Sequence, residues 1–172
     1  MVSSTFLGIP TPSPDQFLNR VDRLGERFAI NVPPVFVLSD LQGIPAGTLG
    51  RELAEHFAAH QFQPLTSGPR RKQLHDVVHV ITGYGVDPIG ELEVQAFMLG
   101  GKFFPMHIVL GLALFDMSDR QRRSLDLDRA MIFRRAWQAY QRGRRSGFDI
   151  DRWQPEQQWH IPLSEVCQTL GL

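Results

Sequence analysis

Apolar residues recur at three- and four-residue spacing along most of this chain, and no stretch longer than a few residues alternates between apolar and polar side chains. The first pattern gathers apolar side chains on one face of an α-helix, whereas strict alternation is typical of a half-buried strand. At 172 residues the chain is long enough to enclose one hydrophobic core. The sequence therefore predicts an all-α protein, a single-domain helical bundle. Residues 1–12, rich in Ser, Thr and Pro, are predicted to be a flexible N-terminal arm, and residues 13–172 one helical domain.

Capping residues and apolar spacing place the individual helices. Ser13 is a typical start for a first helix that reaches Phe28, and Pro162 lies at the start of a short last helix. A longer helix is expected over residues 126–145, with a buried stripe made of Ala130, Phe133, Trp137 and Tyr140. Residues 35–38 are a candidate short strand with no evident pairing partner.

The charge of the chain is balanced, with 18 basic and 18 acidic residues. A generic nucleic-acid binder carries an excess of positive charge, so no nucleic-acid partner is expected. Nine arginines nevertheless fall between Arg120 and Arg145. This span is either an ordinary solvated helix face or a surface that faces an anion or a membrane, and the sequence leaves both open.

Cysteine usage and hydropathy bear on the compartment. The single cysteine, Cys167, excludes an internal disulfide, fits a reducing compartment and is expected to be a small buried residue. The N-terminus has no basic start followed by an apolar stretch, so no signal peptide is expected. The most apolar run, residues 103–115, is shorter than the ~20 residues that cross a bilayer, and we expect a buried core helix rather than an interfacial segment. A bacterial cytoplasm is the simplest location.

The segment HDVVH carries three potential metal ligands, His75, Asp76 and His79. Residues 75 and 79 lie one turn apart on the same helix face, with residue 76 between them around the circumference. Two imidazoles and a carboxylate can therefore converge on one point.

Glu91 is expected to join this group from the next helix. Gly83 ends the first helix, and Asp87 followed by Pro88 is a typical start for the second. In an antiparallel helical hairpin, positions equally distant from the connecting loop face each other. We therefore predict a metal site on a helical hairpin, with a solvent-facing polar cluster as the alternative, and its ligands are His75, Asp76, His79 and Glu91.

Imidazole and carboxylate ligands define the class of metal. They suit zinc, iron, manganese or cobalt, and spacing alone does not choose among them; we take zinc first and keep magnesium among the alternatives. The site has three ligands rather than four if Asp76 stays outside the inner shell, and positions are left open for substrate or water. In the HExxH hydrolases a Glu stands where this chain has Asp76, one methylene shorter, so that type of hydrolase is disfavoured.

A second pair of histidines, His56 and His60, lies one helical turn apart in the helix predicted over residues 51–62. The pair could share a metal, but no carboxylate stands nearby on the same face at a known ligand spacing. We interpret the two as surface histidines.

HDVVH, a gap of eleven residues and Glu91 form a composite motif that is more specific than either part. Further segments occur in a matching order: IPAGTLGRELAEHF, HVITGYG, GELEVQAF, WQAYQRGRRS and PLSEVCQTLGL. Together, over roughly residues 38–172, they resemble the coenzyme Q biosynthesis protein 4 family, whose signature is HDxxH-x11-E. RRKQLHD departs from the RxRExHD of mitochondrial members, with Gln73 at a usually acidic position, and LGGKFFPMHIVLGLALF is patterned differently from eukaryotic relatives.

The resemblance implies an all-helical protein of ubiquinone biosynthesis. It also implies metal-dependent oxidative decarboxylation, in which a hydroxyl group replaces the ring carboxylate of a prenylated hydroxybenzoate. The catalytic residues would then be the metal ligands His75, Asp76, His79 and Glu91. The alternative is a non-catalytic, prenyl-lipid-binding scaffold that organises quinone-biosynthesis enzymes at the membrane.

The same resemblance implies contacts with lipid. An apolar groove for a prenyl tail has as its candidate lining Phe97, Met98, Phe103, Phe104, Met106 and Ile108. Arg134 and Arg135 are candidates for contact with anionic headgroups. The implied location is peripheral, on the inner face of a bacterial membrane. Expected partners are a prenylated aromatic or isoprenoid lipid, other quinone-biosynthesis proteins and, as an open option, a second copy of the chain.

Overall fold

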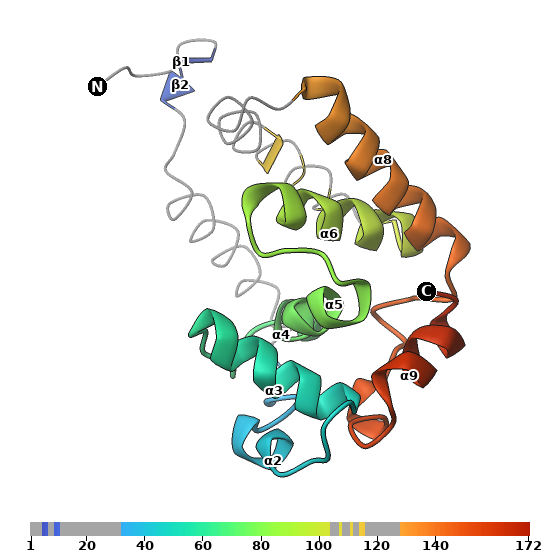
Figure 1. The fold of residues 1–172 in the computed structure, drawn as a ribbon. Helices are drawn as coiled ribbons and strands as arrows, with labels where there is room; N and C mark the ends of the chain where they lie inside the picture. The colour runs from blue at the N-terminus through green and yellow to red at the C-terminus, as the bar shows by residue number, and fades with distance from the viewer. Residues whose placement is uncertain are drawn as a thin grey trace.

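The computed structural model describes residues 5–6, 9–10, 32–103, 107, 111, 114–115 and 128–172. Among these residues regular structure is helical, apart from one isolated bridge and the antiparallel pairing of β1 (Thr5–Phe6) with β2 (Ile9–Pro10). The prediction of an all-α fold is thus confirmed for the described part of the chain (Figure 1). The helix predicted from Ser13 to Phe28 lies outside the described residues.

The described chain begins its helices with α2 (Leu38–Gln42) and α3 (Leu49–His60). The strand predicted at residues 35–38 is wrong, because Leu38 already begins α2 and Leu41 turns into the core instead. Helix α3 follows the prediction. Its N-cap Thr48 accepts a hydrogen bond from the Arg51 amide, and the helix ends where Gln61 adopts a left-handed conformation with φ 56°.

The next two helices, α4 (Arg70–Gln73) and α5 (His75–Thr82), are almost one. Leu74 between them keeps a right-handed helical conformation, and the Val78 amide donates to its carbonyl. Gly83 then ends α5 in the left-handed conformation (φ 73°) that glycine adopts at no steric cost, as the sequence predicts.

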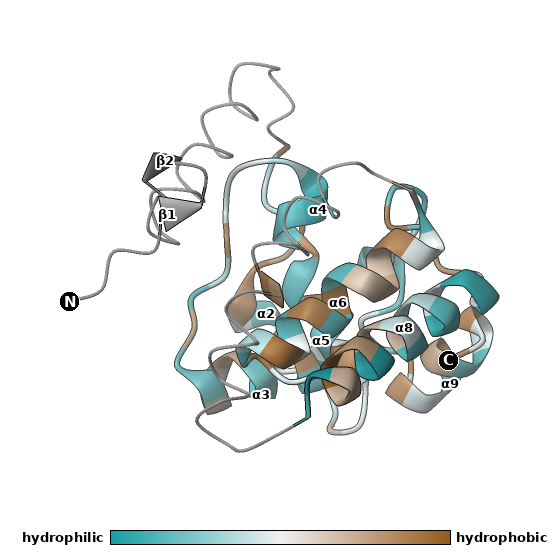
Figure 2. Cartoon of the chain, turned by 90° about the horizontal axis from the view of Figure 1, so that it is seen from above, coloured by the Kyte–Doolittle hydropathy of each residue, from teal (hydrophilic) through white to brown (hydrophobic). Residues whose placement is uncertain are grey.

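Helix α6 (Pro88–Gly101) starts at the predicted cap, where the Asp87 carboxylate accepts from the amides of Ile89 and Gly90. The helix is mostly apolar along its length (Figure 2). It does not return antiparallel to α5 as expected: Figure 1 shows α5 end-on while α6 lies across the view. The connection between the two helices is tight, because a Cβ at Gly90 would stand 2.0 Å from the Gly85 carbonyl oxygen. The first turn of α6 therefore lies directly against the loop that leads into it.

Helix α8 (Arg129–Arg145) packs along α6 through glycines. A Cβ at Gly143 would lie 2.0 Å from the Phe97 carbonyl oxygen, and one at Gly100 would lie 2.2 Å from the Tyr140 carbonyl oxygen. The two backbones therefore approach more closely than any side chain would permit.

This contact overturns the predicted buried stripe of α8. Phe133 and Trp137 are 65% and 53% exposed, Ala130 is exposed and Tyr140 is only half-buried. The buried positions are instead Ile132, Ala139 and Gly143. Small residues face α6 because a close helix contact has no room for aromatic rings, and the rings lie on the outer face.

The C-terminal segment closes the core with the short η1 (Pro155–Gln157) and α9 (Leu163–Leu170), which begins after Pro162 as predicted. It is tied to the start of α3 by backbone hydrogen bonds, among them Leu49 amide to Ile161 carbonyl. Cys167 is only partly buried, and its thiol donates to the Ile81 carbonyl. The main core combines apolar residues of α3, α5, α6 and this segment, for example Leu53, Phe57, Val77, Phe97, Phe148 and Ile150.

The apolar run 103–115 is described only in part. His107, Gly111, Leu114 and Phe115 are helical, His107 is buried, and Leu114 and Phe115 pack against a small core cluster of Ile89, Leu92 and Ile132. Of these described residues, the buried helical His107 agrees with the expected core helix, whereas Phe103 at the start of the run is exposed. No helix in the described ranges is both long enough and apolar enough to span a bilayer.

The glycine contact makes a prediction about stability. Gly143→Ala should lower the free energy of unfolding by about 1–3 kcal/mol or more, because the added methyl must push α6 and α8 apart. Urea denaturation followed by circular dichroism measures the change. The matched control is Gly43→Ala, where the nearest backbone atom is 3.8 Å away, and it should change stability little. Equal stabilities for the two variants would contradict the close contact.

Candidate metal centre

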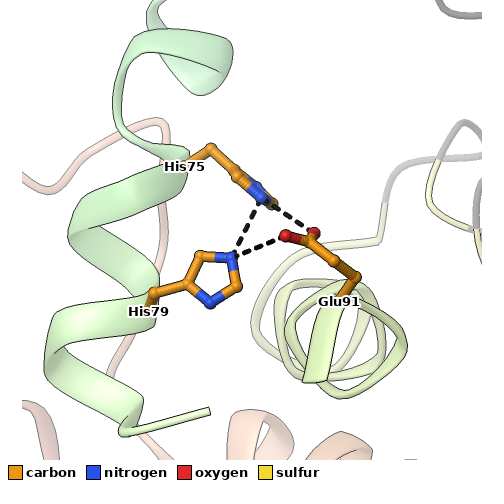
Figure 3. A group of neighbouring side chains, drawn as sticks. All are labelled: His75, His79 and Glu91. Atoms are coloured by element: carbon orange, nitrogen blue, oxygen red, sulfur yellow. Dashed lines mark hydrogen bonds and ion pairs between the residues drawn. The ribbon is translucent and has the colours of Figure 1, made fainter. Parts of the chain in front are cut away.

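Three side chains, those of His75, His79 and Glu91, form a small triangle between α5 and α6, and each histidine contacts a different oxygen of Glu91 (Figure 3). His75 Nε2 lies 3.0 Å from Glu91 Oε2, His79 Nε2 lies 3.2 Å from Glu91 Oε1, and the two imidazole Nε2 atoms are 3.2 Å apart. Around an ion with ligand bonds of about 2.0–2.1 Å in tetrahedral geometry, ligand atoms are separated by roughly 3.3 Å. The two imidazole nitrogens thus have nearly the separation of two ligands of one ion, and Glu91 presents one oxygen to each of them.

The orientation of His79 supports this fit. Its Nδ1 lies 3.1 Å from the Tyr84 carbonyl oxygen, an acceptor, so Nδ1 carries a proton and Nε2 is the nitrogen that faces the triangle. A backbone carbonyl in this position is the usual partner that orients a metal-binding histidine. His79 is buried, whereas His75 and Glu91 are about one-quarter exposed. The centre thus has a fixed inner side and an accessible outer side.

Within the triangle, hydrogen bonds and charge pairing shift the pKa values more than burial does. Burial alone would raise the pKa of Glu91, but hydrogen bonds from His75 and His79 hold that pKa at about 2. Burial would lower the pKa of His79, and the hydrogen bond and charge of Glu91 raise it on balance. Glu91 is therefore a carboxylate at neutral pH, which is the form that binds a metal.

Asp76 does not join the triangle. Its carboxylate Oδ1 lies 3.9 Å from His56 Nε2 on α3. Of the two arrangements that the sequence leaves open, this geometry favours the one with Asp76 outside the inner shell.

His56 is not the surface residue that the sequence predicts. Its side chain is only 12% exposed, and its ring stacks on His79 with centroids 5.8 Å apart. Burial lowers its pKa. His60, one turn later, is exposed as predicted. The sequence contains no signal for the burial of His56, because that burial depends on where α5 packs against α3.

A second polar group missed by the sequence analysis lies one helical turn from the triangle. Arg71 precedes His75 by four residues, and Gln95 follows Glu91 by four. His107 lies between them, with Nδ1 2.8 Å from Gln95 Oε1 and Nε2 3.3 Å from Arg71 Nη1. Burial, followed by the charge of Arg71, lowers the pKa of His107 to about 4, so its imidazole is neutral at pH 7. Arg71 and Gln95 each lie four residues from a ligand on the same helix, and this i, i+4 spacing is a sequence pattern from which the two could have been predicted.

The residues predicted to contact lipid lie in different environments. Phe97 and Met98 belong to the packed core rather than to a groove, and Phe103 is exposed. Phe104, Met106 and Ile108 lie outside the described residues. Arg135 donates two hydrogen bonds to the buried Glu93 carboxylate, whereas Arg134 is exposed. A surface depression near the end of α8 is lined by residues outside these predicted sets, including Trp137, Gln141 and Arg142.

The fold and the triangle define a class: a helical protein that presents two histidines and one carboxylate from crossing helices. The family model described as coenzyme Q (ubiquinone) biosynthesis protein Coq4 matches residues 23–172. The chain belongs to this family.

Known relatives agree with the assignment. The mitochondrial ubiquinone biosynthesis protein COQ4 homologues of Rattus norvegicus and Mus musculus are each 30% identical over 149 residues, which cover 78% of this chain and 54% of theirs. The chain thus spans about half the length of these curated relatives. The crystal structure of a Nostoc punctiforme protein assigned to ubiquinone biosynthesis shares the fold, with a TM-score of 0.66 and 23% identity, covering 88% of this chain and 74% of that one.

The structure explains why Gln73 stands at a position that is usually acidic in mitochondrial family members. Gln73 is buried, its Oε1 accepts from the Val35 amide, and its amide nitrogen donates to the carbonyls of Val32 and Gly68. A carboxylate has no N–H to donate to these carbonyls. Glutamine therefore fits the packing of the segment before α2.

The low pKa of Glu91 predicts how the metal-free protein responds to acid. The pKa is about 2 in the folded chain against an ordinary 4.5, so this carboxylate stabilises the fold above about pH 4.5 and the stabilisation is lost as the pH falls towards 2. Between pH 5 and 3 the parent should lose about 1–2 kcal/mol more of its unfolding free energy than Glu91→Gln. Urea denaturation of the metal-chelated protein at pH 5 and at pH 3 measures this difference in unfolding free energy. The exposed Glu165→Gln variant should follow the parent, and a parent-like Glu91→Gln would contradict the pairing.

Proposed function

We propose that this protein binds one divalent metal ion through His75, His79 and Glu91 and uses it in the oxidative decarboxylation of a prenylated hydroxybenzoate. The single observation that carries the metal is the approach of the two histidine Nε2 atoms to each other and to the Glu91 carboxylate, at 3.0–3.2 Å. The substrate class rests on membership of a family of ubiquinone biosynthesis. Asp76 has an outer role in this proposal, beside the inner ligands.

The ligand set bears on the identity of the metal. Two histidines and one carboxylate with open positions form the set by which non-haem iron(II) oxygenases hold their metal, and the same donors also suit zinc, manganese and cobalt. Conversion of a ring carboxylic acid and water into a phenol and carbon dioxide releases two electrons and two protons, and we take dioxygen, reduced to hydrogen peroxide, as their acceptor. Iron therefore stands beside zinc as a leading candidate.

When bound, the ion would supply Lewis-acid polarisation of the hydroxyl and carboxylate oxygens of the substrate. The chain supplies the positioning. The Tyr84 carbonyl holds the Nδ1 proton of His79 and keeps Nε2 free, while the buried side of the triangle excludes water from behind it. The partly exposed edge at His75 and Glu91 is where a substrate can approach.

The outer face of α8 supports a peripheral contact with membrane. Phe133 and Trp137 lie one turn apart and are exposed, with the exposed Arg134 beside them. Aromatic rings next to arginine suit the interface between water and anionic lipid. In this proposal α8 rests on the membrane that holds the prenylated substrate, and Arg135 stays with Glu93.

A turnover experiment tests the reaction. Protein loaded with iron(II) or zinc and given a prenylated hydroxybenzoate in air should release carbon dioxide and form the hydroxylated ring. His79→Ala and His75→Ala should each lower the rate by more than about 100-fold, because each removes an inner ligand. Labelled carbon dioxide release gives the rate, and circular dichroism checks that each variant is folded.

The control for this experiment is His160→Ala, which removes an exposed histidine of the C-terminal segment and should keep the parent rate. Substrate that binds but leaves the assay unchanged would favour the non-catalytic scaffold that gathers quinone-biosynthesis enzymes. Parent-like rates in both His75→Ala and His79→Ala would contradict the assignment of the site.

A further inference from the structure

Gln95 presents an amide donor that its neighbours orient and that no described residue accepts from. The side chain is only 6% exposed. Its one hydrogen bond with the described residues comes from His107, whose Nδ1 lies 2.8 Å from Gln95 Oε1. A buried amide normally has partners for its nitrogen as well as its oxygen, because an unpaired donor costs free energy. The nitrogen of Gln95 is therefore available to a ligand.

Arg71 determines which atom of this carboxamide faces His107. A guanidinium can only donate, so His107 Nε2, 3.3 Å from Arg71 Nη1, is the acceptor. The proton of the imidazole is then on Nδ1, and this N–H requires an oxygen, which is Gln95 Oε1. Arg71 is itself held by the Asp151 carboxylate, with Nε 2.6 Å from Oδ1 and Nη2 2.5 Å from Oδ2. The amide nitrogen of Gln95 thus cannot exchange places with the oxygen.

This polar group lies beside the metal triangle along the same helices. His75 on α5 pairs directly with Glu91 on α6, and one turn away His107 bridges Arg71 on α4 to Gln95 on α6. Four residues of α-helix rise about 6 Å, so the Gln95 carboxamide follows the Glu91 carboxylate on the same face of α6 at about that interval. One small aromatic acid can therefore contact both groups.

The amide nitrogen of Gln95 is also open to a ligand from outside. In the ranges that the structure describes, His56 Nε2 is the one side-chain nitrogen or oxygen that is both sealed from solvent and without a hydrogen-bond partner. The Gln95 nitrogen has no partner in these ranges either, so it is not sealed. A molecule that enters at the partly exposed edge formed by His75 and Glu91 can hydrogen-bond to it.

We propose that Gln95 is a substrate-binding residue, whose amide nitrogen donates a hydrogen bond to a carboxylate oxygen of the aromatic acid at the metal centre. His107, Arg71 and Asp151 are positioning residues, which act by orienting Gln95. The inference rests on the proposed function for the class of substrate. A hydrogen bond to a charged acceptor is stronger than one to a neutral acceptor. Gln95 therefore favours the acid over the phenol that replaces it, and so favours release of the product.

Binding to the zinc-loaded full chain, measured without dioxygen, tests the role of Gln95. The two probes are a geranylated 4-hydroxybenzoate and the geranylated phenol that lacks its carboxylate. The parent should bind the acid more tightly than the phenol. Gln95→Met, which has a similar length and no N–H, should weaken binding of the acid by about tenfold or more and of the phenol by less than about threefold. Gln168→Met, at an exposed position of α9, should keep both parent affinities.

A pair of His107 variants tests the positioning while Gln95 stays intact. His107→Leu removes the donor to Gln95 and should lower the preference for the acid, whereas His107→Asn supplies an N–H near the place of Nδ1 and should keep most of it. Zinc affinity should stay parent-like in every variant, which separates loss of the carboxylate contact from damage to the metal centre. This pair decides the question even if Gln95→Met fails to fold.

The outcomes distinguish this proposal from the proposed function. A folded Gln95→Met or His107→Leu with the parent's preference for the acid would overturn the role of Gln95, as would a parent that binds the two probes equally. Acid that binds with the expected preference but releases no carbon dioxide in the turnover experiment would overturn only the proposed reaction.

Discussion

The close approach of Gly90 to the Gly85 carbonyl is the contact on which the metal centre depends. The first turn of α6 can lie against its own connecting loop because residue 90 has no side chain. The Asp87 carboxylate fixes the helix start at the same point by accepting from two amides of that turn. Glu91 follows at once, so its carboxylate reaches α5 within the first turn. The loop and the cap therefore position the one ligand that does not come from HDVVH.

The sequence predicted the members of the triangle better than the path that joins them. His75 and His79 share a face because of their spacing, and the interval to Glu91 implied a helix break, which Gly83 and Asp87 supply. The crossing of the two helices was not predictable, because capping signals locate helix ends and contain no information on the angle between axes. The side on which Asp76 lies was open for a similar reason: α3, which meets it, is distant in sequence.

In helix α8 the large hydrophobic side chains are not the buried ones. Phe133 and Trp137 have large aromatic side chains, and periodicity places them on one stripe, yet they are exposed. Ala139 and Gly143 face α6 because backbone contact between the helices requires small residues there. A periodic pattern identifies a helix reliably, whereas the face it buries depends on the shape of its neighbour. The exposed aromatics are then available for an external surface, which the proposal assigns to lipid.

The central claim is that His75, His79 and Glu91 hold one divalent ion, and anomalous diffraction tests it most directly. Crystals of the protein grown with zinc or iron(II) would be measured at the absorption edge of that metal. The account predicts an anomalous peak bonded to both histidine Nε2 atoms and a Glu91 oxygen, at about 2.0–2.2 Å. A fully loaded crystal with no peak between α5 and α6, or a peak that no histidine of this triangle contacts, would contradict it.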